Sequence, residues 1–323
     1  MRLLQVRDLQ THLHLRRGVL RPVDGVSLDV DEGETLGLVG ESGSGKTMTG
    51  LSLLRLLPKG AGRIAGGSIQ LDGRELTSLS EREMARSVRG RLIAMIAQDP
   101  MTSLNPVWSI GTQVMTPMRV HGIESGARLR AAAAEILRRV RIPSAEKRLP
   151  DYPHQFSGGQ RQRIVTAMAI GSSPRLLIAD EPTTALDVTI QAQIIALLRR
   201  IQTETGAGII LITHDLGVAA SLCHRIAVMY AGRIVEQGPV RSVYRKPAHP
   251  YTQALLAAIP RLGAGSDRLT AIPGQPPSLA ELPSGCRFAP RCPHRMAVCD
   301  TYPPETEIGD DHRAACWLHA RPN

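Results

Sequence analysis

Apolar and polar side chains alternate over much of the first seventy residues, and this alternation predicts β-strands. Residues 3–9 and 26–30 alternate with a period of two, which is typical of half-buried strands. Other runs are almost wholly apolar, which predicts buried strands; they cover residues 35–39, 176–180 and 208–214. We expect further strands at residues 67–72 and 91–97, and a closing hairpin at 226–232 and 233–238.

Helical spacing appears between these runs. Apolar residues recur every three or four positions at Met48, Leu51, Leu54 and Leu57, and Pro58 should end that helix. A second stripe, at Ile190, Ile194, Leu197 and Ile201, predicts a helix with a core-facing side. Residues 105–153 are rich in Ala, Leu, Arg and Glu, so we expect an inserted helical subdomain at about residues 105–172.

The length of 323 residues exceeds one hydrophobic core, so we expect a large domain at residues 1–245 and a smaller one at 246–323. Past about residue 247 the chain becomes rich in Pro, Gly, Cys and His, and residues 273–285 are typical of a loop or linker. The sequence contains neither an apolar run of about 18 residues nor the pattern of a signal peptide. We therefore expect the chain to stay in the cytosol.

The net charge of +10 fits a solvated basic surface, and it also fits contact with an anionic membrane or with nucleic acid. Aromatic residues make up only 3% of the chain, which argues against a surface for stacking bases.

A phosphate-binding loop is predicted where the first buried strand ends. The segment GESGSGKT fits G-x-x-x-x-G-K-[ST], with a predicted strand before it and a helix after it. Backbone N–H groups and a helix N-terminus would face the phosphates, Lys46 would reach the β- and γ-phosphates, and Thr47 would offer its hydroxyl to Mg²⁺. The candidate nucleotide-binding residues are Gly40, Glu41, Ser42, Gly43, Ser44, Gly45, Lys46 and Thr47.

Two carboxylates lie at the end of the predicted strand at residues 176–180, Asp180 as its last residue and Glu181 directly after it. Asp180 would hold Mg²⁺, and Glu181 would act as general base for an attacking water. The alternative is that DEP simply marks a surface turn at the strand end.

A second glycine-rich segment, SGGQ, opens a predicted helix about twenty residues before these carboxylates. A helix N-terminus offers bare N–H groups, so Ser157, Gly158, Gly159 and Gln160 form a second candidate anion site. We do not expect one chain to fold both sites onto one nucleotide. A head-to-tail dimer would place this segment of one chain and residues 40–47 of another around each ATP.

Together these motifs resemble the ATPase subunit of ABC transporters over residues 1–240. The loop at residues 40–47 matches Walker A, residues 157–160 match the signature, and Asp180 with Glu181 match Walker B and the catalytic base. The resemblance further assigns Gln98 to the Q-loop, where it would also bind Mg²⁺. It assigns Asp187 to the D-loop and His214 as the switch histidine. It implies a RecA-like α/β core with a β-rich N-terminal subdomain, the inserted helical subdomain, and ATP with Mg²⁺ as cofactors.

Two positions depart from the family pattern. Phe156 stands where the signature usually begins with Leu, an apolar change that should be tolerated. The family stacks adenine on an aromatic residue of the first strands, and the matching position is Leu13, between His12 and His14. The stacking residue stays open.

Three further segments, residues 98–106, 180–194 and 249–260, resemble importers of dipeptides, oligopeptides and related solutes, most closely their "D" subunit. That resemblance implies a paralogous ATPase as heterodimer partner, two transmembrane permeases, an extracytoplasmic binding protein and a place on the cytoplasmic face of the membrane. It also implies that a permease helix docks near residues 98–118, although this segment could be a packed loop. The transported solute stays open.

The remaining signal is a set of cysteines in the last forty residues, Cys286, Cys292, Cys299 and Cys316. Their spacing is wider than in common zinc sites, and four thiolates suit a [4Fe–4S] cluster. Some importers of the resembled group carry such a cluster in this extension. Zinc, with His294, His312 or His319 nearby, and free thiols stay open, while Cys223 is expected in the core.

The alternative function is a soluble ABC ATPase that is not coupled to transport. Such proteins usually carry two ATPase halves or a long coiled-coil insertion, and this sequence shows neither. A non-catalytic structural partner would be expected to lose Lys46, Glu181 or the signature, and all are present.

Overall fold

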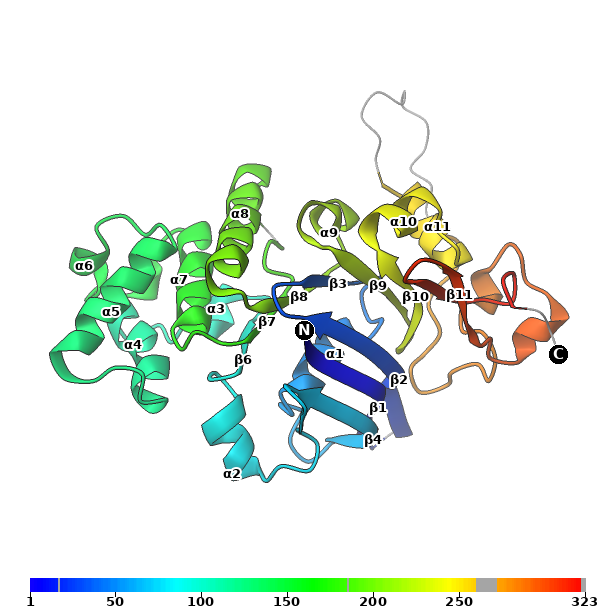
Figure 1. Ribbon diagram of the computed structural model, residues 1–323, viewed down its shortest axis with the longest axis horizontal. Helices are drawn as coiled ribbons and strands as arrows, with labels where there is room; N and C mark the ends of the chain where they lie inside the picture. Colours follow the sequence, from blue (N-terminus) through cyan, green and yellow to red (C-terminus); the bar gives the residue numbers. More distant parts are fainter. Residues whose placement is uncertain (17, 185, 260–271, 321–323) are drawn as a thin grey trace. The chain divides into compact units, whose positions relative to one another are not determined.

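The computed structural model describes residues 1–16, 18–184, 186–259 and 272–320 (Figure 1). The chain divides into two compact units. The first unit contains Met1–Leu3, Val30–Thr35 and Ser78–Ile212. The second contains Leu4–Asp29, Leu36–Thr77 and Thr213–Asn323. Within the described ranges, no helix combines the length and apolar character needed to cross a membrane. Residues 260–271 and 321–323 of the expected C-terminal domain lie outside the described residues.

The first unit combines three parallel strands with a group of helices. The strands pair in the order β8-β7-β6, and α4, α5 and α7 pack against one another, as Figure 1 shows. Helices occupy much of the range 105–172, where the sequence predicts a helical region. The elements are β6 (Ile93–Ile96), β7 (Leu176–Asp180), β8 (Gly208–Thr213), α2 (Glu81–Glu83), η1 (Met84–Val88), α3 (Pro100–Ser103), α4 (Ile110–Val120), α5 (Gly126–Arg139), α6 (Ala145–Arg148), η2 (Pro153–Gln155), α7 (Gly158–Ile170) and α8 (Val188–Thr205).

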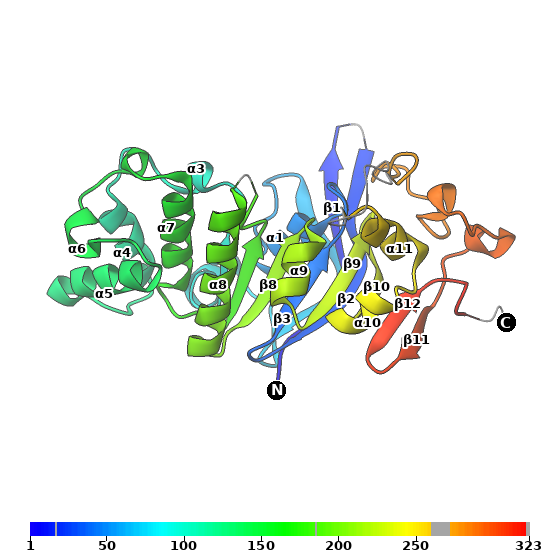
Figure 2. The same ribbon diagram turned by 90° about the horizontal axis from the view of Figure 1, so that it is seen from above.

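The second unit contains most of a four-stranded sheet, in the order β2-β1-β4-β5, and a run of strands in the order β11-β12-β10-β9-β3. β3 and β9 are parallel, whereas β9 and β10 form the predicted antiparallel hairpin. Figure 2 shows β11 and β12 as a short pair near the C-terminus. The elements are β1 (Arg2–Leu15), β2 (Gly18–Asp31), β3 (Thr35–Val39), α1 (Lys46–Leu53), β4 (Gly62–Leu71), β5 (Arg74–Glu75), α9 (Leu216–Leu222), β9 (Arg225–Tyr230), β10 (Arg233–Pro239), α10 (Val240–Arg245), α11 (Pro250–Ala257), η3 (Ala289–Arg291), η4 (Ala297–Asp300), β11 (Glu305–Gly309) and β12 (His312–Ala315).

The predicted helix after the glycine loop was too long. We expected it to continue to Leu57, but α1 ends at Leu53. Arg55 adopts a positive φ of 51°, which no right-handed helix accommodates, and Leu56 is 47% exposed. The apolar spacing at 54 and 57 therefore belongs to the turn that leads into β4.

A buried carboxylate organises the C-terminal part of the second unit. Glu236 of β10 is 1% exposed and accepts hydrogen bonds from the backbone N–H groups of Ala248 and His249, both at 2.8 Å. Its Oε1 also lies 2.8 Å from Nε2 of His312 in β12. One side chain therefore joins β10 to the start of α11 and to β12.

Removing this charge should destabilise the fold. We expect Glu236→Gln to lower the free energy of unfolding by about 2–3 kcal/mol, because the amide turns an N–H toward buried donors. Glu305→Gln, which changes an exposed residue of β11 that bonds Gln237, is the matched control and should cost under about 0.5 kcal/mol. Urea denaturation checks both variants, and equal losses would contradict the role given to Glu236.

Candidate functional site

The segment between β3 and α1 curls so tightly that two of its glycines have no room for a side chain. Gly45 has a φ of 106°, and a Cβ there would lie 2.0 Å from the carbonyl oxygen of Pro22. A Cβ at Gly40 would lie 2.2 Å from the carbonyl oxygen of Met229. Gly43 also has a positive φ, of 77°, but space around it is open. Glycine is therefore required by contact at both ends of the curl.

Lys46 begins α1, and its side chain folds back over the curl. It is 5% exposed, and its Nζ donates to the carbonyl oxygens of Gly40 and Glu41, each at 2.8 Å. The ammonium therefore sits inside the loop. Thr47 follows it in the first turn of α1 and is exposed.

In the first unit, Gln98 and Glu181 lie together. Glu181 follows the end of β7, and its Oε2 accepts hydrogen bonds from Gln98 Nε2 at 3.0 Å and from Thr184 Oγ1 at 2.9 Å. Its φ is 45°, a conformation that is uncommon for a residue with a side chain, and its N–H donates to Ile212 O. Asp180, the last residue of β7, is 2% exposed.

The segment SGGQ caps the N-terminus of α7 within the first unit. Ser157 Oγ accepts from the backbone N–H of Gln160, and Gln160 Oε1 accepts from the N–H of Ser157. A Cβ at Gly159 would lie 2.8 Å from Ile190 Cγ2. Phe156 is buried under the guanidinium of Arg148, 4.2 Å from its ring centre. The cap fixes the start of α7 and leaves Gly158 exposed.

The other predicted residues lie at the starts of helices or on β1. Asp187 caps α8 by accepting from the N–H of Ile190 at 2.9 Å. His214 follows β8 in the second unit, where the loop of residues 40–47 also lies, and it is exposed. On β1, Leu13 and His12 are half-buried, and burial lowers the pKa of His12.

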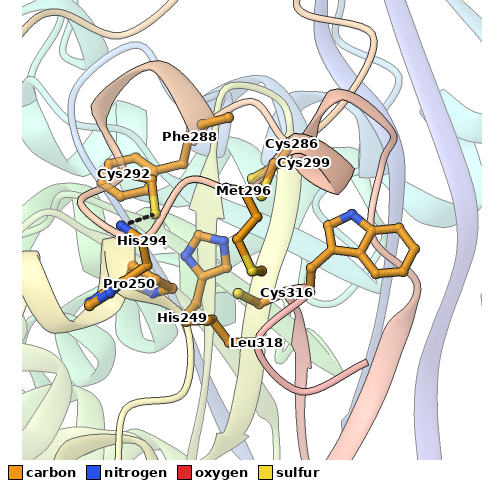
Figure 3. Close-up of a pocket in the computed structure, with 12 residues that line it drawn as sticks. His249, Pro250, Cys286, Phe288, Cys292, His294, Met296, Cys299, Cys316 and Leu318 are labelled. Carbon is orange, nitrogen blue, oxygen red and sulfur yellow. Dashed lines mark hydrogen bonds between the residues drawn. The ribbon is translucent and has the colours of Figure 1, made fainter. Parts of the chain in front are cut away.

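The four C-terminal cysteines line one pocket, together with His249, Phe288 and Met296 (Figure 3). Burial raises the pKa of the Cys286 and Cys292 thiols and raises that of Cys316 to about 11. The pocket encloses a cavity of only about 10 Å³, which is about the space of one water molecule. Across the described ranges, no three His, Cys, Asp or Glu side chains are arranged to hold a single metal ion.

His249 carries an unpaired polar atom at this pocket. It is 1% exposed, and burial lowers its pKa to about 3, so the ring is neutral at pH 7. Nδ1 accepts the backbone N–H of Tyr251 at 3.0 Å, which assigns the proton to Nε2. Among the described residues, Nε2 has no hydrogen-bond partner. A buried N–H donor of this kind needs an acceptor.

Comparison with known proteins places these features in a family. A family model described as ABC transporter matches residues 23–184, which is half of the chain, and a model of the oligopeptide/dipeptide transporter C-terminal region matches residues 235–299. The chain belongs to the ABC transporter ATPases. Within that family it is an ATP-binding subunit of the dipeptide and oligopeptide importer group.

Individual relatives agree over nearly the whole chain. It is 53% identical to a probable peptide ABC transporter ATP-binding protein of Sinorhizobium fredii, covering 98% of this chain and 94% of the relative. It is 48% identical to the dipeptide transport ATP-binding protein of Bacillus subtilis, covering 98% and 95%. A solved dimeric ATP-binding cassette in a post-hydrolysis state, bound to ADP and Pi, has a TM-score of 0.66 at 25% identity, covering 74% of this chain and 99% of that one.

The close contact at Gly45 allows a test that separates the cost of a steric clash from the cost of a positive φ. Gly45→Ala should lower the free energy of unfolding by about 4 kcal/mol or more, because the new methyl meets a backbone carbonyl. Gly43 also has a positive φ, but a side chain there would meet open space. Gly43→Ala should therefore lower the free energy of unfolding by only about 1–2 kcal/mol. Urea denaturation of both variants checks this, and similar losses would show that contact with Pro22 does not matter.

Proposed function

We propose that this chain uses ATP binding and hydrolysis to drive the uptake of dipeptides, oligopeptides or related small solutes. The observation that carries this proposal is the 53% identity to a peptide ABC transporter ATP-binding protein over 98% of the chain. The match of residues 235–299 to the oligopeptide/dipeptide transporter region supports it. ATP is hydrolysed by this chain, and the solute is selected by its partners.

The loop between β3 and α1 is the proposed phosphate site. Its curled backbone presents N–H groups to phosphate oxygens, and the buried Lys46 ammonium, which now contacts two loop carbonyls, is placed to exchange them for the β- and γ-phosphates. The exposed hydroxyl of Thr47 would bind Mg²⁺, as would Asp180 and the amide oxygen of Gln98.

Glu181 is the proposed general base. Hydrogen bonds from Gln98 and Thr184 hold its carboxylate. As the water oxygen bonds to the γ-phosphorus and the bond to the ADP oxygen breaks, Glu181 accepts the proton that the water loses. His214 would contact the γ-phosphate and stabilise the charge that develops there.

The signature segment would act on an ATP held by a second chain. Its glycines are the first residues of the 13-residue helix α7, and Ser157 caps that helix. The backbone N–H groups at this N-terminus would bind an anion such as a phosphate. Residues 157–160 and Asp187 would face the nucleotide of the partner in a head-to-tail dimer. We infer a paralogous ATPase as that partner, and dimer closure on ATP then converts binding energy into movement.

Replacing the proposed base tests the hydrolysis site. Glu181→Gln should keep ATP binding but lower turnover by about 100-fold or more, and it should trap an ATP-bound assembly. Glu204→Gln changes an exposed glutamate of α8 and is the matched control. Phosphate release measures both, and near-normal turnover of Glu181→Gln would refute the assignment.

We also propose that the four-cysteine pocket holds a [4Fe–4S] cluster. The four cysteines and His249 line one apolar pocket, and sulfur atoms bound to iron would supply the acceptor that the unpaired Nε2–H of His249 lacks. In such a cluster each thiolate binds a different iron, so the sulfur atoms need not converge on one point. A cluster here would crosslink a segment too small for a core of its own.

Metal analysis of chain purified without oxygen tests the pocket. We expect about four irons and about four acid-labile sulfides per chain. Cys292→Ser should lose them, whereas Cys223→Ser, which changes the cysteine outside the pocket, should keep them. One zinc per chain, or no metal, would refute the cluster.

The remaining proposals concern organisation and partners. We infer that residues 1–245 form the ATPase domain and residues 246–323 an importer-type extension. The chain would act on the cytoplasmic face of the membrane with two permeases and an extracytoplasmic binding protein. Exposed apolar side chains at Met101, Val107 and Trp108 support docking of a permease helix near residues 98–118. Co-purification with membrane subunits separates this from an ATPase that is not coupled to transport.

A further inference from the structure

Residues near the C-terminus hold the second residue of the phosphate loop by its side chain. Arg291 Nη1 lies 2.8 Å from Glu41 Oε2, and Nη2 lies 3.1 Å from Oε1, so the pair is bidentate. The Arg291 side chain is 4% exposed and that of Glu41 is 26% exposed. Burial of this kind shields the pair from solvent, which distinguishes it from an ordinary surface ion pair.

A second C-terminal residue holds the backbone of the same glutamate. The N–H of Glu41 donates to the Tyr251 hydroxyl at 2.8 Å. Tyr251 is fully buried, and its ring packs against Tyr230 and Phe288, with centroids 4.5 and 5.4 Å away. The hydroxyl is therefore fixed by packing and cannot follow the loop freely.

Two further hydrogen bonds hold the Arg291 side chain in place. Its Nε donates to the carbonyl oxygen of Pro273 at 2.9 Å, and its Nη1 donates to the Tyr230 hydroxyl at 3.2 Å. These bonds set the position of the guanidinium independently of Glu41. The ion pair therefore attaches Glu41 of the loop to a guanidinium whose position is already set.

The backbone carbonyl of Glu41 also accepts a hydrogen bond from the Lys46 ammonium. The Glu41 carbonyl oxygen and that of Gly40 each lie 2.8 Å from Nζ. A displacement of Glu41 would therefore shift an acceptor of the lysine proposed to reach the phosphates. The side chain, the N–H and the carbonyl of this one residue each have a defined partner.

We propose that Arg291 and Tyr251 are positioning residues for nucleotide binding, which act through Glu41 to keep the phosphate loop in its binding conformation. A loop held in one conformation loses less freedom when phosphate binds, so affinity depends on this support. The inference rests on the proposed nucleotide-binding role of residues 40–47. It adds that the importer-type C-terminal segment contributes to that site.

The test is titration of the full-length chain with MgADP, which avoids hydrolysis, by calorimetry. Tyr251→Phe removes only the hydroxyl and should weaken affinity by roughly three- to tenfold. Tyr302→Phe removes another hydroxyl of the C-terminal segment, beside Arg233, and should leave affinity unchanged. Arg291→Gln and Glu41→Gln should each weaken affinity by roughly tenfold, and the double variant should be no weaker than either single one.

The outcomes separate this inference from the assignment of the loop. Lys46→Ala should abolish MgADP binding, and if it does not, the proposed phosphate site is wrong. If Lys46→Ala abolishes binding while Tyr251→Phe matches wild type, or if the Arg291 and Glu41 effects add independently, the positioning role is refuted. If Arg291→Gln does not fold, the comparison of Tyr251→Phe with Tyr302→Phe decides alone.

Discussion

The tight curl of backbone between Gly40 and Gly45 is the constraint around which the second unit is built. Carbonyl oxygens of Met229 and Pro22 occupy the space where side chains would stand at its two ends. β9 and β2 can approach the loop this closely only because those positions are glycine. The buried ammonium of Lys46 then satisfies two carbonyls of the curl, so sequence, packing and charge favour the same loop conformation.

Buried strands were the elements that the sequence predicted best. The bounds of β3 and β7 agree with the apolar runs, because every residue of both strands is buried. β1 was predicted as residues 3–9 but extends over Arg2–Leu15. Its pairing with β4 shifts register between Arg7 and Gln10, beside the positive φ of Asp8. Such an irregularity breaks the period of two, so alternation alone could not follow the strand past it.

Local motifs also indicated much of the candidate site, whereas contacts between distant segments did not follow from any motif. The loop at residues 40–47 and the capping serine at 157 depend on neighbours a few positions away, which spacing reveals. Arg291 and Glu41 are 250 positions apart, and each alone resembles an ordinary surface charge. Glu236 likewise gives no sign in the sequence that it is buried. The partners of Arg291, Glu41 and Glu236 come close to them only in the folded chain.

The segment His249-Pro-Tyr251 links the cysteine pocket to the loop of residues 40–47. His249 lines the pocket, its Nδ1 accepts the N–H of Tyr251, and the Tyr251 hydroxyl accepts the N–H of Glu41. The two rings are two residues apart at the start of one helix, α11, so neither can shift without strain on the other. Phe288 packs against both rings, with centroids 5.9 and 5.4 Å away. Because a close-packed core resists small displacements, the arrangement of the pocket constrains the support of the loop.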